Sequence, residues 1–207
     1  MRSGTVNTVN LWEIENRCRE EGYELICGVD EAGRGPLAGP VCAAAVILPQ
    51  GLMLDGLNDS KKLTEKKREE LFPQIRENAL SFSIAFADVE EIERLNILGA
   101  TFLAMNRAIA GLGLRPQLAL IDGNRNRGIE TESRCIIGGD GKCASIAAAS
   151  ILAKVSRDHL MLELAKKYPQ YGFEKHKGYG TKAHYEALRQ YGPSPVHRMS
   201  FLKSFLG

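Results

Sequence analysis

Apolar and small residues gather in five short runs that predict the strands of one sheet. The runs at 24–29 and 41–48 are rich in small or β-branched residues, as buried strands require. Residues 81–87 (SFSIAFA) alternate between polar and apolar positions and predict a further strand. The runs at 117–121 and 134–137 complete the set, and each is followed closely by glycine and aspartate.

Helical patterns are interleaved with these strands. Thr64 is a suitable N-cap for a charged helix over 65–78, and Asp88 is one for a short helix. A long helix is predicted over 142–168, and the small residues of its first half allow a close approach to another backbone. Further helices are expected at 11–21, 98–112 and about 181–190. The pattern predicts an α/β or α+β protein whose central mixed sheet is flanked by helices.

Length and composition indicate a single globular domain. The 207 residues are 44% apolar and 25% charged, which excludes a disordered chain, a collagen-like rod and a disulfide-stapled miniprotein. The longest apolar run, 41–48, is far shorter than the ~20 residues of a membrane helix. The polar start shows no secretory signal, so we expect a cytoplasmic protein. Five scattered cysteines without a C-x-x-C pair indicate reduced thiols rather than a zinc site.

The charge is unevenly distributed, although the net charge is only +2. Residues 154–203 hold ten Lys and Arg against four Asp and Glu. Within them, 166–184 combines five lysines with four aromatic residues, and such mixtures neutralise phosphates and stack on bases. The pattern fits a nucleic-acid surface, and it also fits a solvated helical surface whose aromatic residues reach the core.

Acidic residues follow three of the predicted strands. Asp30 and Glu31 come after the first strand, Asp122 directly precedes Gly123, and Asp140 ends a Gly-Gly-Asp sequence. If these strands are neighbours, four carboxylates converge at one edge of the sheet, where divalent cations must relieve their repulsion. Oxygen ligands favour Mg²⁺ or Mn²⁺, and two such ions ~4 Å apart can hydrolyse a phosphodiester. Alternatively each carboxylate serves a turn, and Asp140 caps the long helix.

Other polar residues carry weaker signals. The Gly33-Arg34-Gly35 sequence lets a substrate approach the backbone, although a tight turn is the better explanation for these three residues alone. Their glycine spacing is not that of a dinucleotide site. Ser145 and Ser150 are expected to pack inside the long helix. The histidines show no metal-ligand spacing and are expected at surface or helix positions; they are His159, His176, His184 and His197.

Seven motifs together resemble the bacterial ribonuclease HII family, the type 2 ribonucleases H. They run in family order from about residue 26 to residue 201, which is most of the chain. The motifs are GVDEAGRGPLAGPV at 28–41, NDSKKL at 58–63, LIDG at 120–123, GGD at 138–140, IAAASILAKVSRD at 146–158, HKGYGTKAH at 176–184 and PVHRMSF at 195–201. Arg34 and the short stretch before the first motif favour type 2 over the related type 3 enzymes.

The resemblance implies a ribonuclease H-like fold in a single catalytic domain over 1–207. Its core would span about 24–168, and a helical, basic C-terminal part would span about 169–207. It implies an endonuclease that cleaves the RNA strand of RNA–DNA hybrids and incises 5′ of single ribonucleotides in duplex DNA. Two metal ions, Mn²⁺ or Mg²⁺, would assist the hydrolysis, which leaves 5′-phosphate and 3′-OH ends.

The resemblance also implies roles for individual residues. The four metal-binding catalytic carboxylates would be Asp30, Glu31, Asp122 and Asp140. Gly33, Arg34 and Gly35 would sense the ribose 2′-OH, Tyr179 would pack at the RNA–DNA junction, and Lys61 would contact a phosphate. Ser60, Arg157 and Asp158 match the family without an assigned role.

Partners and alternatives complete these expectations. The expected partners are RNA–DNA hybrids and duplex DNA that contains ribonucleotides, with a monomeric protein and no membrane. For the C-terminal tail at 200–207 there are two alternatives: it contacts a replication factor, or it covers the core. Two other functions remain open: a different nuclease on the same fold, and a non-catalytic module that binds hybrids.

Overall fold

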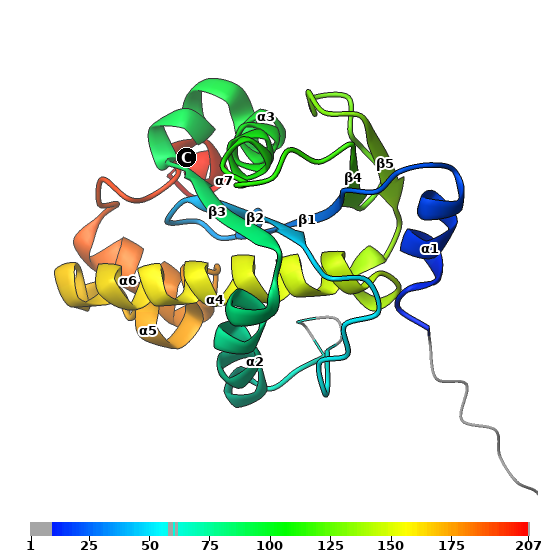
Figure 1. The fold of residues 1–207 in the computed structure, drawn as a ribbon. Coiled ribbons are helices and arrows are strands. Elements are labelled where there is room, and N and C mark those ends of the chain that lie inside the picture. The colour runs from blue at the N-terminus through cyan, green and yellow to red at the C-terminus, as the bar shows by residue number, and fades with distance from the viewer. Residues whose placement is uncertain (1–9, 58–59, 61, 207) are drawn as a thin grey trace, which may run out of the picture.

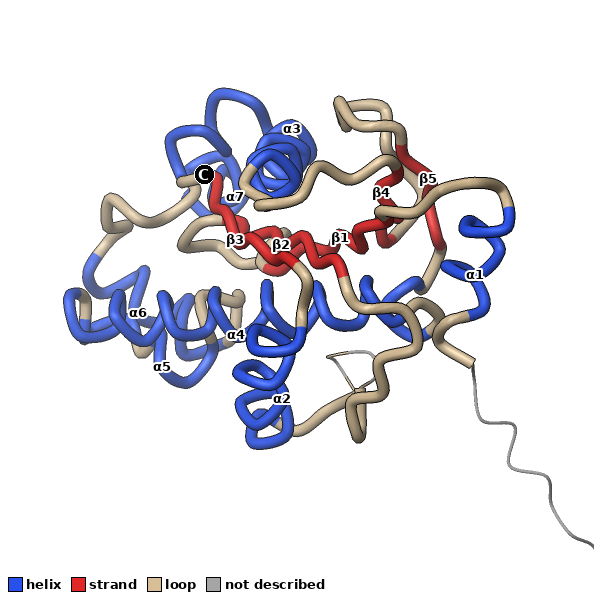
Figure 2. The backbone as a smooth tube through the Cα atoms, viewed as in Figure 1, coloured by secondary structure: helices blue, strands red, loops and turns tan. Residues whose placement is uncertain are grey.

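A five-stranded mixed sheet forms the centre of the computed structural model, which describes residues 10–57, 60 and 62–206. The strand order is β3-β2-β1-β4-β5 (Figures 1 and 2). β2 pairs antiparallel with β1 and β3, whereas β4 pairs parallel with β1 and β5. The strands are β1 (Ile26–Ala32), β2 (Val41–Ile47), β3 (Ser81–Ala87), β4 (Leu118–Asp122) and β5 (Ser133–Ile136). The mixed sheet and the five predicted strands are confirmed.

Helices cover both faces of this sheet because its central strands are apolar on both sides. Every residue of β2 is buried, and successive residues point to opposite faces. Cys42, Ala44 and Val46 pack toward α4 (Ala144–Lys167) and α2 (Glu65–Asn78). The alternate residues of β2 pack toward α3 (Val89–Ala110), which lies on the other face (Figure 1). The result is a three-layer arrangement with two separate cores.

The small residues at the start of α4 let this helix lie against β1. An added Cβ at Gly28 would stand 2.2 Å from the Ser145 carbonyl carbon and 2.3 Å from the Ile146 nitrogen. Gly28 therefore has no space for a side chain. The predicted close backbone approach of this helix is confirmed, and it fixes how α4 lies along the strand that carries Asp30.

The predicted helix starts are confirmed at Thr64 and Asp88. Thr64 accepts a hydrogen bond from the Lys67 N–H, and Asp88 forms a reciprocal capping box with Glu91. The two helices predicted after Asp88 are joined in α3, which is interrupted at Asn96 by a φ of 58°. The Asn96 side chain restarts the helix by accepting the N–H groups of Leu98 and Gly99.

The C-terminal part of the chain packs beside the second half of α4 and then reaches α3 (Figure 1). A short strand-like bridge joins Ala38 to His197, so this part also holds the connection between β1 and β2. The residues expected to form a short tail are helical, and Leu202 among them is fully buried. The remaining helices are α1 (Glu13–Glu20), α5 (Phe173–His176), α6 (Lys182–Tyr191) and α7 (Met199–Leu206), with short 3-10 turns η1 (Gly139–Gly141) and η2 (Pro169–Tyr171).

No helix in the described ranges has the length and apolar character needed to cross a bilayer. The cysteines within these ranges are free thiols, and Cys27 and Cys42 lie in the core as predicted.

The contact between β1 and α4 predicts a severe effect of Gly28→Ala. The new methyl group would overlap backbone atoms that cannot move independently of the helix. We expect the free energy of unfolding to fall by about 2 kcal/mol or more, measured by urea denaturation. Gly113→Ala is the control, because its added Cβ would lie 3.7 Å from the Ser81 Oγ, an ordinary contact. Equal stability of the two variants would contradict the packing described.

Candidate metal and substrate site

Three carboxylates meet where parallel strands end. The pairing of Val29 with Ile121 places the residues that follow them, Asp30 and Asp122, side by side on β1 and β4. Asp140 joins them from η1, which follows β5. Ligand oxygens of the three aspartates lie within 4.8 Å of one another. The expected convergence at the carboxyl edge of the sheet thus brings Asp30, Asp122 and Asp140 together.

Main-chain hydrogen bonds hold two of these carboxylates in place. The Asp122 Oδ1 accepts the Gly139 N–H at 2.7 Å, which ties the end of β4 to η1. The Asp30 Oδ1 accepts the Glu31 N–H, also at 2.7 Å. These bonds limit the rotation of both carboxylates, which offer ligand oxygens within 4.8 Å of one another and of Asp140.

Asp140 is not the cap of the long helix, so that alternative is wrong. The N-cap of α4 is Cys143, which makes no side-chain capping bond. The buried Glu15 of α1 takes this role, because its Oε1 accepts the Ser145 N–H at 3.0 Å. Sequence pattern could not reveal a cap that lies 130 residues away.

Glu31 lies apart from the three aspartates. Adjacent residues of a strand point to opposite faces, so Asp30 faces α4 and Glu31 faces α3. Its carboxylate is 3.2 Å from the Arg34 guanidinium. Three of the four acids that were expected in one tight group therefore form it. Glu31 lines the same cavity from the other face of the sheet.

Burial makes the charge on Asp30 costly. The side chain is 3% exposed, and burial raises its pKa well above the ordinary value, with further increases from the charges of Glu31 and Asp122. Hydrogen bonds from the Glu31 N–H and the Ser150 hydroxyl oppose this rise. A cluster of carboxylate oxygens gathered this closely, with one of them buried, fits a divalent cation such as Mg²⁺ or Mn²⁺.

A cavity of about 220 Å³ connects the carboxylates with the Gly33–Gly35 loop and Tyr179. Tyr179 is half exposed, and its ring lies over Gly35. Twelve residues line the cavity: Asp30, Glu31, Ala32, Gly33, Arg34, Gly35, Ser60, Asp122, Ser150, Lys154, Arg157 and Tyr179. All the predicted site residues except Asp140 and Lys61 therefore share one cavity, and Lys61 lies outside the described residues.

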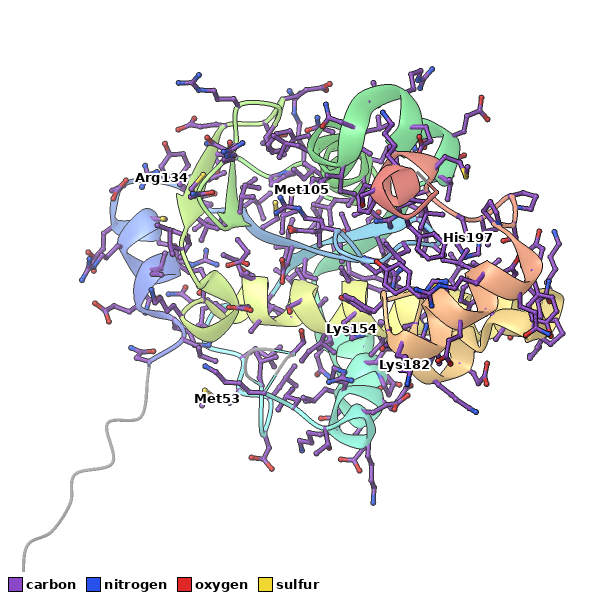
Figure 3. The ribbon with its side chains drawn as sticks, turned by 180° about the vertical axis from the view of Figure 1, so that it is seen from behind. Met53, Met105, Arg134, Lys154, Lys182 and His197 are labelled. Atoms are coloured by element: carbon purple, nitrogen blue, oxygen red, sulfur yellow. The ribbon has the colours of Figure 1, made fainter. Side chains whose placement is uncertain are left out.

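Two polar residues that line the cavity were not predicted as site residues. Ser150 was expected only to pack, yet its hydroxyl is 2.6 Å from that of Ser60 and also bonds to Asp30. Lys154, near the middle of α4 (Figure 3), brings a positive charge into the cavity and bonds to Asp158 at 2.7 Å. The signal available in the sequence was their spacing of four residues, which puts both on one face of α4.

A second cavity of about 310 Å³ lies on the α3 side of the strand ends. It shares Glu31, Arg34 and Asp122 with the first cavity and continues over Asn124 and Arg125. The acidic edge is thus open on both faces, and an arginine flanks it on the second face.

Two histidines are buried: His184 lies in a helix, as one of the expected alternatives, whereas His197 lies neither at the surface nor in a helix, which corrects the expectation for it. The Ser194 N–H donates to the His197 Nδ1, so the hydrogen of the neutral ring sits on Nε2. That Nε2 donates to the His184 Nε2 at 3.0 Å, and the His184 Nδ1 donates to the Tyr179 carbonyl at 2.9 Å. This chain of bonds ends on the backbone of Tyr179 and requires both rings to be neutral.

Comparisons with known proteins agree with the fold and the site. A sequence model of the family Ribonuclease HII matches residues 27–204. Ribonuclease HII of Caldicellulosiruptor bescii is 54% identical over 197 residues, which are 95% of this chain and 96% of that protein.

Two solved structures of related proteins have a similar fold. The ribonuclease H2 of Pyrococcus horikoshii is similar with a TM-score of 0.71 and 27% identity over 86% of this chain and 93% of that one. The Archaeoglobus fulgidus ribonuclease HII chain, solved in a complex with PCNA, gives 0.68 and 25% over 85% and 94%.

The mixed sheet with its acidic edge defines a hydrolytic nuclease of the ribonuclease H class. The chain belongs to the ribonuclease HII family.

The buried histidines predict a pH-dependent stability. Burial, and then the neighbouring His184, lower the pKa of His197 to about 4 from an ordinary 6.5. Between these values the unfolded chain binds a proton that the folded protein excludes. Stability is therefore complete above about pH 6.5 and is lost as the pH falls toward 4.

His197→Gln should remove this contribution. The difference in unfolding free energy between wild type and variant should shrink by up to about 3 kcal/mol between pH 7 and pH 4, measured by urea denaturation. Parallel pH curves for the two proteins would show that His197 is not held neutral.

Proposed function

We propose that this chain hydrolyses the RNA strand of RNA–DNA hybrids and incises 5′ of single ribonucleotides in duplex DNA. The products carry a 5′-phosphate on the ribonucleotide side and a 3′-OH on the other. One observation carries the proposal: a single cavity joins a carboxylate cluster to a glycine loop and an exposed tyrosine. Hydrolysis and recognition of the sugar can therefore take place at the same phosphodiester.

The carboxylates of Asp30, Asp122 and Asp140, with Glu31 opposite, would hold two divalent ions, Mn²⁺ or Mg²⁺. When bound, such ions supply a hydroxide nucleophile near neutral pH and stabilise the departing 3′ oxygen. The hydrogen bonds to Asp30 and Asp122 keep these carboxylates oriented, which spares the site a rearrangement during the reaction.

The Gly33–Gly35 loop is suited to recognise a ribose hydroxyl. Its three N–H groups donate to no acceptor among the residues that the structure describes, whereas the carbonyls of Gly33 and Arg34 are occupied. A 2′-OH offers these donors an oxygen acceptor that a deoxyribose lacks. The free N–H groups therefore favour ribonucleotides over deoxyribonucleotides at the cleavage position.

Tyr179 and the basic residues would hold the rest of the duplex. The Tyr179 ring borders the loop, where it can pack on the sugar next to the ribonucleotide. Lys154 and Arg34 in the cavity, and Arg125 beside it, offer positive charge to phosphates. Lys61 stays a proposed phosphate contact, and the monomeric state stays a proposal.

Contact with a replication factor through the C-terminal tail also stays a proposal. The structure of the relative from Archaeoglobus fulgidus is a complex with PCNA. In this chain Ser200 bonds to Glu93 of α3, and Leu202 is buried, so α7 is docked on the body of the protein. Any such contact would involve the exposed side of α7.

Asp122→Asn tests the proposed function. The amide keeps the shape and the oxygen that accepts the Gly139 N–H, but it removes a ligand charge. We expect turnover of a DNA duplex with one ribonucleotide to fall by roughly 100-fold or more in Mn²⁺ and in Mg²⁺. Asp55→Asn, the same change at an exposed position, is the matched control and should keep full activity.

An all-DNA duplex and a chelator complete this assay. Cleavage of the all-DNA duplex would indicate a different nuclease on this fold. Binding without any product in either metal would indicate a non-catalytic hybrid-binding module. Near-normal turnover by Asp122→Asn would disprove its role as a ligand.

A further inference from the structure

Arg198 has a buried guanidinium whose hydrogen bonds all go to one loop. Its side chain is fully buried, and it donates through Nη2 to the Gly33 carbonyl at 2.7 Å and through Nη1 to the Arg34 carbonyl at 3.0 Å. Its Nε donates to the Gly39 carbonyl at 2.9 Å. One side chain from the C-terminal part thus holds both ends of the connection between β1 and β2.

Arg157 of α4 holds the same loop from another direction. Its guanidinium is also buried and donates to the carbonyls of Ala38 and Pro40 and, on the C-terminal side, to that of Lys177. An added Cβ at Gly33, whose φ is +97°, would stand 2.0 Å from the Arg157 Nε. The loop is therefore bonded to both guanidinium groups and is also packed tightly against that of Arg157.

These bonds fix the direction of the free N–H groups. In a planar trans peptide, the carbonyl of one residue and the N–H of the next point in opposite directions. Because the Gly33 and Arg34 carbonyls point at Arg198, the N–H groups of Arg34 and Gly35 point away from it. Both lie in the loop that lines the cavity beside the carboxylates.

The arrangement is specific to a guanidinium. Three carbonyls on different parts of a loop match the planar fork of arginine, whereas a lysine ammonium is a compact point charge that reaches fewer of them. Burial, and then the charge of Arg157, lower the pKa of Arg198 to about 9, so the group stays charged at pH 7. Burying two cations whose hydrogen bonds go mainly to carbonyls costs desolvation free energy, and packing alone would not require it. This cost indicates a role for the two arginines beyond packing.

We propose that Arg198 is the positioning residue for ribose recognition, because it orients the Arg34 and Gly35 N–H groups toward the 2′-OH of the substrate. Arg157 holds the loop through the carbonyls of Ala38 and Pro40. Arg198 fixes the peptide planes that follow Gly33 and Arg34 through their carbonyls. The inference rests on the proposed function, since it assigns the origin of the sugar selectivity of that same cavity.

Arg198→Lys tests this inference through selectivity. We expect kcat/KM on a duplex with one ribonucleotide to fall on the order of 100-fold, because the donors are misdirected. The Ki of an all-DNA duplex, used as a competitive inhibitor, should change less than about threefold, because phosphate contacts remain. Equal weakening of both, or no weakening of either, would overturn the inference.

Arg107→Lys is the matched control for lost stability. Arg107 also donates to a main-chain carbonyl, that of Phe86, and to Glu91, but it lies outside both cavities. Arg107→Lys should lower the melting temperature of the protein. It should leave unchanged both kcat/KM on the ribonucleotide duplex and the Ki of the all-DNA duplex. If Arg107→Lys loses selectivity at a similar melting temperature, the effect belongs to general destabilisation and the inference fails.

A second variant covers the case in which Arg198→Lys does not fold. Arg198→Ala leaves a slot for methylguanidinium, whose addition should restore kcat/KM on the ribonucleotide duplex but not alter the Ki of all-DNA duplex. Absence of rescue in a folded Arg198→Ala protein would count against the inference. Failure of the proposed function is recognised separately, because wild type would then cleave no ribonucleotide-containing duplex.

Discussion

The crowding of carboxylates at one edge of the sheet is the constraint on which the site depends. Parallel pairing of β1 with β4 and of β4 with β5 carries Asp30, Asp122 and the η1 turn of Asp140 to one place. Asp30 is buried there beside α4, which can lie so close only because Gly28 and the first residues of α4 are small. The same packing that stabilises the core therefore places negative charge where water cannot fully solvate it.

Buried positive charge lies next to the same cavity, behind the 33–40 loop. Arg157 and Arg198 come from α4 and the C-terminal part, and they hold the 33–40 loop by its carbonyls. The histidine chain that ends on the Tyr179 carbonyl fixes the neighbouring wall in the same way. The C-terminal part thus shapes the substrate side of the cavity, whereas the sheet edge supplies the acids. This division explains how one cavity can combine hydrolysis with selection of the sugar.

The strands, the main helices and the strand-end aspartates could be predicted because each follows from a local pattern. The position of Glu31 on the opposite face follows from strand alternation, but the first strand was predicted to end at residue 29, whereas β1 continues to Ala32 and includes Glu31. Arg157 and Arg198 could not be assigned, since most of their partners are main-chain carbonyls of the 33–40 loop, more than 100 residues away in sequence. The two buried histidines could not be assigned because the contact between their rings forms only when the C-terminal part folds. The capping role of Glu15 was missed for the same reason, and α7 was missed because its pattern is short.

Repulsion among these carboxylates in the absence of divalent cations can be measured from the unfolding free energies of wild type and Asp30→Asn. In chelator, Asp30→Asn should be more stable than wild type, because it removes a buried charge. In Mn²⁺ at about 100 times the Kd, the unfolding free energy of wild type should rise by about 2.7 kcal/mol and that of the variant by much less. The stability advantage of the variant should therefore shrink or reverse. A variant that is less stable in chelator and gains as much from Mn²⁺ as wild type would show that Asp30 neither suffers this repulsion nor binds the ion.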